Sequence, residues 1–114
     1  MQIPLQIAAR YEELSPSDEA LIRRRAAKLE TFYSRITGCR VLVESPQRRP
    51  HGREFVVHID LTFPGGKLVV KRRPEPELTT AIHEAFQAAE RQLEDFKERR
   101  ATRRLATAER TDES

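Results

Sequence analysis

Basic residues between Leu21 and Arg73 are the side chains of this sequence best suited to bind another molecule. That stretch holds thirteen Lys and Arg against four Asp and Glu, although the 114-residue chain has a net charge of only +3. The rest of the chain is therefore acidic. A local excess of positive charge attracts polyanions such as nucleic acid. Two interpretations remain open, namely a positive face for a polyanionic partner and an ordinary solvated surface.

Three of these cations share one side of a predicted helix that runs from Pro16 to about Ser34. At 100° per residue, Arg24, Lys28 and Arg35 fall within roughly 40° of one another, and Arg25 borders them. Like charges one turn apart cost a few tenths of a kcal/mol, which counterion release from a phosphate backbone would offset. Alternatively, their long side chains only cover the apolar edges of the helix.

Further cations lie later in the chain. Lys71 and Arg73 project to the same side of a predicted strand, and Arg100 lies near the end of the last helix, where cations also suit the helix dipole. The exposed face of that helix is acidic, with Glu84, Glu90, Glu94, Asp95 and Glu98. We therefore expect binding mainly along the first helix, with a contribution from the end of the last.

Residue patterns typical of catalysis or of metal binding are missing. The three histidines, His51, His58 and His83, lie on different predicted elements. None has another potential metal ligand at helical spacing. Cys39 is expected to face the core beside Val41, and Gly65-Gly66 joins two strands, unlike a phosphate loop, which precedes a helix. We predict a protein that is not an enzyme and has no cofactor, metal or small-molecule substrate.

The aromatic residues narrow the kind of nucleic acid that could bind. All five phenylalanines are predicted at core positions: Phe32, Phe55, Phe63, Phe86 and Phe96. Stacking of single-stranded bases needs exposed aromatic rings on strands. The sequence therefore favours structured RNA, recognised through its phosphates and its shape.

Hydrophobic periodicity predicts the elements that must position these side chains. Strands are expected at 2–8, 39–45, 55–63 and 67–73, and helices at 16–34 and from 78 to about 100. Ser15 and Asp18 have the spacing of a capping box at the first helix. The result is an α+β fold, a single β-α-β-β-β-α domain over 1–100. Its four-stranded mixed sheet carries both helices on one face, as in double-stranded-RNA-binding domains. Residues 101–114 are predicted to be a tail, partly helical and then disordered.

Two segments resemble the ribosome hibernation promoting factors and ribosome-associated inhibitors, also called sigma-54 modulation proteins, in their short form. They are Lys28–Ile36, and Ala81-Ile82 together with Arg91-Gln92-Leu93. The resemblance implies binding to 16S rRNA in the small (30S) subunit channel, which blocks the messenger and transfer RNA sites under stress. The resemblance also implies which residues bind RNA, by their positions in the family. They are Arg24, Lys28 and Arg35 on the first helix, and Arg91 and Lys97 on the last. Ala88 stands where relatives often have Lys.

Several further expectations complete the sequence-based hypothesis. One cysteine, no long apolar run and no signal-peptide pattern favour a cytoplasmic protein without membrane contact. The chain lacks the C-terminal dimerisation domain of long family members, and we expect a monomer. The alternatives are a protein-interaction adaptor and a double-stranded-RNA-binding module that is not tied to the ribosome.

Overall fold

The computed structural model describes residues 4–10, 13–45 and 54–113, and for residues 103–113 only the course of the backbone. Its elements are β1 (Leu5–Arg10), α1 (Pro16–Phe32), β2 (Gly38–Glu44), β3 (Val56–Phe63), β4 (Gly66–Lys71) and α2 (Leu78–Glu113). The predicted β-α-β-β-β-α order is confirmed. The predicted exposed loop at 46–52, with His51, and the first residues of the predicted first strand lie outside the described residues.

The four strands form one sheet in the order β1-β2-β3-β4. β1 pairs with β2 in parallel, and the other two pairs are antiparallel, which confirms the predicted mixed sheet. Pro4 directly precedes the edge strand β1, where its missing N–H leaves no gap in the described pairing. The turn between β3 and β4 contains Pro64 and then Gly65, whose φ of 90° suits a residue without a side chain.

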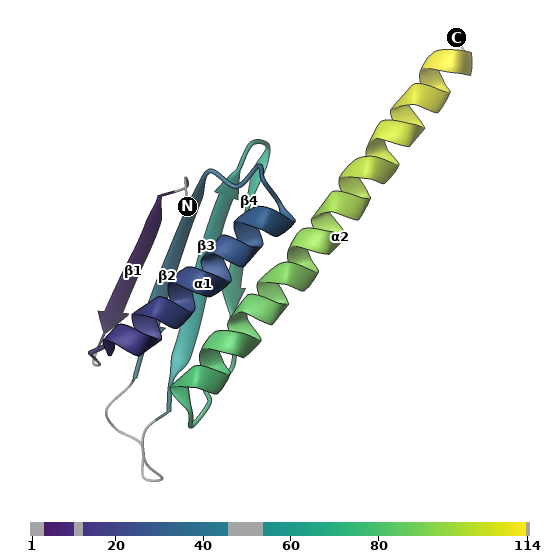
Figure 1. Ribbon diagram of the computed structural model, residues 1–114. Helices are drawn as coiled ribbons and strands as arrows, with labels where there is room; N and C mark the ends of the chain where they lie inside the picture. The colour runs from purple at the N-terminus through teal and green to yellow at the C-terminus, as the bar shows by residue number, and fades with distance from the viewer. Residues whose placement is uncertain (1–3, 11–12, 46–53, 114) are drawn as a thin grey trace.

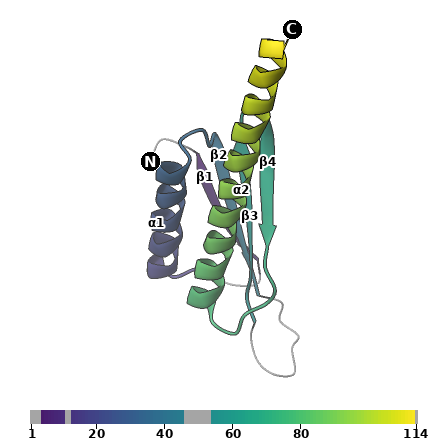
Figure 2. The same ribbon diagram turned by 90° about the vertical axis from the view of Figure 1, so that its right-hand side faces the viewer.

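Both helices pack on the same face of the sheet, so the molecule has two layers (Figures 1 and 2). Each helix buries one stripe against the inward side chains of the strands: Ile22, Ala26 and Leu29 from α1, and Ile82, Phe86 and Leu93 from α2. Tyr33 meets Phe63 and Phe96 edge-on, with ring centroids 5.7 and 6.1 Å away. This aromatic cluster joins the end of α1 to the sheet and to α2.

Phe32 corrects one prediction, because it lies at the surface and not in the core. The residue is 38% exposed, whereas the adjacent Tyr33 is buried, with 7% of its surface exposed. Neighbouring residues near the end of a helix point about 100° apart, so only one of the two can face the sheet. Tyr33 takes that position. Phe32 is left at the rim, with Lys97 Nζ 4.7 Å from the centre of its ring.

Ser15 caps the first helix as predicted. Its hydroxyl accepts the Asp18 N–H at 3.1 Å, and the Asp18 carboxylate accepts the Ser15 N–H at 3.2 Å. We expect Ser15→Ala to lower the free energy of unfolding by about 1 kcal/mol, because an N–H of the first turn loses its acceptor. Urea unfolding measures this loss. Ser34→Ala, at an exposed position outside the helices, is the matched control, and an equal loss in both variants would contradict a capping role.

Helix α2 is longer than the apolar pattern predicted. It runs for 36 residues to Glu113, and its C-terminal turns extend beyond the sheet (Figure 1). Residues 101–113 contain no Gly or Pro and are rich in Ala, Arg and Glu, which favour helix even without a packed face. The division into a domain at 1–100 and a tail at 101–114 stays a prediction.

Candidate RNA-binding surface

Arg24 and Lys28 lie on the solvent side of α1, as the helical periodicity predicted. Arg24 is exposed and sits two residues after the buried Ile22, on the opposite side of the helix. The side chain of Lys28 is 66% exposed. Arg35 is exposed too, but it lies outside the helix, because α1 ends at Phe32 and Tyr33 adopts an extended conformation. The helical geometry used to align Arg35 with the other two was therefore wrong.

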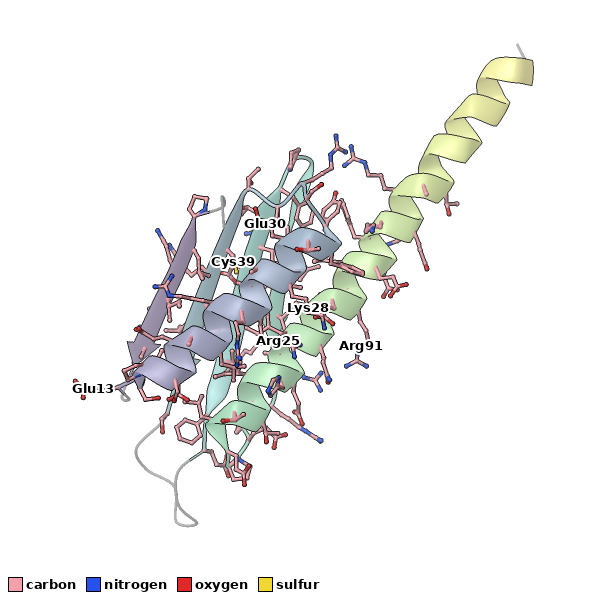
Figure 3. All side chains as sticks on the ribbon, in the orientation of Figure 1. Glu13, Arg25, Lys28, Glu30, Cys39 and Arg91 are labelled. Carbon is pink, nitrogen blue, oxygen red and sulfur yellow. The ribbon has the colours of Figure 1, made fainter. Side chains whose placement is uncertain are left out.

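Arg25 lies between the two helices and is only 14% exposed (Figure 3). Its Nη1 donates to Nδ1 of His83 at 2.9 Å, and its Nη2 lies 3.5 Å from Oε1 of Glu90. The guanidinium carbon is 5.8 Å from the centre of the Phe86 ring. These contacts make Arg25 a link between α1 and α2, and they leave little of its charge for a partner in solution.

The contacts of Arg25 predict a change in stability rather than in RNA binding. We expect Arg25→Ala to cost about 2 kcal/mol of unfolding free energy, because a hydrogen-bonded charge is lost and Glu90 loses a partner. The exposed Arg24→Ala is expected to cost less than about 0.5 kcal/mol. Urea titrations of the two variants check this difference. Equal stability would show that the contacts of Arg25 with His83 and Glu90 contribute nothing to the free energy of unfolding.

Glu90 is less unfavourable to anion binding than the sequence indicated. Its Oε1 lies 3.5 Å from Nη2 of Arg25 and 3.8 Å from Nζ of Lys28. Two cations from α1 therefore offset this carboxylate on α2. Sequence reasoning missed the group because its members come from two helices and share no local spacing.

A second group of cations meets at the end of α1. Arg35, Lys97 and Arg100 line one hollow of about 190 Å³ together with Tyr33 and Ala101. None of the three cations forms an ion pair with a carboxylate of the described residues. Lys97 and Arg100 lie three residues apart on one side of α2. The fold thus joins candidate residues that the sequence placed on separate elements.

Arg91 lines a neighbouring hollow of about 390 Å³, together with Phe32, Gln87, Glu90 and Glu94. It projects from the outer side of α2, whereas Arg25 lies between the two helices and Lys28 lies at the exposed edge of α1, within reach of Glu90 on α2 (Figure 3). Both helices cover the same face of the sheet, and we call the cations on this side of the molecule the helical surface: Arg24, Lys28, Arg35, Arg91, Lys97 and Arg100.

Lys71 and Arg73 do not belong to the helical surface. Leu68 and Val70 point into the core, so the exposed Lys71 projects from the opposite face of the sheet. Arg73 lies beyond the end of β4, with its Nε 3.9 Å from Oε1 of Glu75. Strand alternation showed that Lys71 and Arg73 share one side, but it did not show which side the helices cover. It therefore could not separate these two residues from the cations of the helices.

The sheet face opposite the helices carries polar side chains, and several of them are paired with one another. Glu44 lies 2.8 Å from Nε2 of His58 and 3.7 Å from Nη1 of Arg10. Arg40 donates to the side-chain oxygen of Gln6 at 3.2 Å. Glu44 and His58 are half-buried by these contacts, whereas Arg40 and Thr62 are exposed.

Cys39 has the environment of a structural cysteine. It is buried beside the sheet core, and burial, with a smaller effect of the nearby Asp60 carboxylate, raises the pKa of its thiol to about 11. The thiol therefore stays protonated at neutral pH and is a poor nucleophile. Within the described part of the chain, no group of three or more His, Cys, Asp or Glu could hold a metal ion. Neither described helix combines the length and apolarity needed to cross a bilayer.

Comparisons with known proteins agree with this fold. A ribosomal subunit interface protein from Coxiella burnetii superposes with a TM-score of 0.72 at 13% identity, over 83% of this chain and 98% of that one. The N-terminal domain of Protein Y from Thermus thermophilus superposes with a TM-score of 0.65 at 20% identity, over 84% of this chain and 99% of that one. A sequence model of the family described as sigma 54 modulation protein / S30EA ribosomal protein matches residues 5–101. The chain therefore belongs to the sigma 54 modulation protein / S30EA ribosomal protein family.

Proposed function

We propose that this protein is a hibernation factor of the cytoplasm that inhibits translation by binding the small ribosomal subunit. It acts as a monomer, contacts 16S rRNA in the subunit channel and occupies the sites of messenger and transfer RNA under stress. It acts by binding and needs neither catalysis nor a cofactor. The observation that carries the proposal is that α1, α2 and the turn after α1 present their solvent-accessible cations on the same side of the sheet, as the helical surface.

The helical surface suits a folded RNA better than isolated bases. Arg24, Arg35 and Arg91 form no ion pair with a carboxylate that the structure describes, so their charges are available to phosphates. Arginine donates in a planar fork that matches phosphate oxygens. The phenylalanine rings are mostly buried, with Phe32 as the exposed exception. Affinity should therefore come from phosphate contacts and from the fit to the shape of the RNA.

Sedimentation of purified small subunits with this protein, at two salt concentrations, tests the proposal. Several phosphate contacts predict co-sedimentation at low salt and a steep loss at higher salt, with a logarithmic slope of about −4. Equal affinity for a plain RNA duplex would favour a general duplex-binding module. Binding that is insensitive to salt would favour a protein-interaction adaptor.

A competition experiment tests the location in the channel. Subunits preloaded with this protein should fail to bind messenger RNA and initiator transfer RNA, because one site cannot hold both. Subunits preloaded with both RNAs should in turn exclude the protein. Simultaneous binding of all three would place the protein elsewhere on the subunit.

A further inference from the structure

We propose that the hollow lined by Tyr33, Arg35, Lys97 and Arg100 is a preformed seat for one phosphate group. This inference rests on the proposed function in one respect, since it takes the phosphate from the backbone of ribosomal RNA. Free inorganic phosphate shares the same chemistry and serves as an independent probe. We call this hollow the phosphate seat.

The phosphate seat brings three cations together from two parts of the chain. Arg35 comes from the turn after α1, and Lys97 and Arg100 come from neighbouring turns of α2. Within the described residues, the lining contains no carboxylate, and no described carboxylate pairs with the three cations. Lys97 and Arg100 lie three residues apart on α2, and like charges at this spacing repel one another. A bound anion would remove that repulsion.

The hydroxyl of Tyr33 is a second, independent observation that points to a ligand at this hollow. Tyr33 is only 7% exposed, and its hydroxyl has no hydrogen-bond partner among the described residues. A buried polar group without a partner costs about 1–3 kcal/mol. A phosphate oxygen in the seat would offer this hydroxyl an acceptor.

Packing already holds the side chains that line the seat in place, so few of them need to become ordered when an anion binds. The Tyr33 ring is fixed against Phe63 and Phe96, whose own centroids are 4.6 Å apart. Lys97 donates to the backbone oxygen of Phe32 at 3.4 Å and lies over the ring of that residue. A preorganised site loses less conformational entropy when it binds.

The end of α1 opposes an anion only weakly. The carboxyl end of a helix carries about half a negative charge. Lys97 already bonds the last carbonyl of α1, at Phe32, and the α1 sequence provides no basic residue of its own in its last turn. The two positive charges of Arg35 and Arg100 remain, and their sum is larger than the partial negative charge at the end of α1.

Three single variants test the phosphate seat on small subunits. We expect Tyr33→Phe to weaken binding about fivefold to tenfold through the loss of one hydrogen bond. Arg100→Gln should weaken binding at least about tenfold and reduce the salt slope by about 1. The matched control is Arg99→Gln, which removes the same charge at an exposed neighbour outside the seat and should change binding less than about threefold.

Thermal unfolding separates a binding role of the hydroxyl from a structural one. Tyr33→Phe should be as stable as the unaltered chain or more stable, because it removes a buried polar group without a partner. A clear loss of stability would show that the hydroxyl already has a partner and would overturn the seat. Wild-type affinity of Tyr33→Phe together with equal effects of Arg99→Gln and Arg100→Gln would overturn it as well, while the proposed function would stand.

Inorganic phosphate gives a readout that does not depend on the ribosome. In a titration of the full chain followed by NMR, the side-chain Nε signals of Arg35 and Arg100 should shift and saturate, and that of Arg99 should not. If the unaltered chain fails to bind subunits, the proposed function fails, and saturation here would still support a seat for free phosphate. Shifts of all three signals without saturation would overturn the seat.

Discussion

Reversing two charges on α1, in the double variant Arg24→Glu with Lys28→Glu, is expected to abolish binding to small subunits and to leave the fold intact. The variant removes two cations and adds two repulsive charges on the helical surface. Each lost contact or added repulsion of about 1.4 kcal/mol is tenfold in affinity, so we expect a loss of at least about 100-fold.

The fold should tolerate this change because both side chains are exposed. The only described ion pair that it breaks joins Lys28 to Glu90 at 3.8 Å, with Lys28 66% exposed. Such exposed pairs contribute at most about 1 kcal/mol. Arg25 stays beside Glu90 and limits the repulsion from the new carboxylate. Circular dichroism and urea unfolding check that the variant is folded before its affinity is measured.

A double variant on the opposite face provides the matched control. Lys67→Glu with Lys71→Glu makes the same change of charge on β4, at two exposed positions of the face turned away from the helices. At physiological salt the Debye length is about 8 Å, so distant exposed charges are largely screened. We expect near wild-type binding. A loss as large as on α1 would mean that net charge drives binding, and it would contradict a specific helical surface.

Phe86→Ala is expected to cause the largest loss of stability. Phe86 is fully buried in α2, among the largest side chains of the core, and it also contacts the guanidinium of Arg25. Truncation of a buried Phe leaves a cavity and costs about 3–5 kcal/mol. The total free energy of unfolding of a small domain is only about 5–15 kcal/mol. The midpoint of unfolding of the variant should therefore shift to a much lower urea concentration, with an unchanged m-value.

Phe32→Ala is the control for this prediction because it removes the same ring from the surface. Phe32 is 38% exposed, with Lys97 over its ring, so we expect its truncation to lower the free energy of unfolding by about 1 kcal/mol or less. Similar losses in the two variants would show that Phe32 belongs to the core after all. The comparison thus tests the one aromatic residue that the hydrophobic pattern misplaced.

The pattern misplaced Phe32 and Arg35 for two different reasons. Phe32 lies inside α1, but the adjacent Tyr33 takes the position that faces the sheet, whereas Arg35 lies beyond the end of the helix. An apolar stripe shows which side of a helix is buried, but it does not show where the helix ends. Tyr33 leaves the helical conformation, so angles extrapolated beyond it have no meaning. The same limit applies to α2, where the fading of the stripe near Arg100 marked the end of packing and not the end of the helix.

The sequence by itself determined the elements and the sheet, because strand alternation, helical stripes, the Ser15 cap and the Pro64-Gly65 turn act between residues close in the chain. It also placed Arg24 and Lys28 on an exposed side of α1. Only the tertiary structure decided which cations share a surface. It paired Arg25 with Glu90, turned Lys71 to the other face, and gathered Arg35, Lys97 and Arg100 around Tyr33. Such contacts join residues far apart in the chain, and their geometry depends on how the two helices pack on the sheet, which no local spacing encodes.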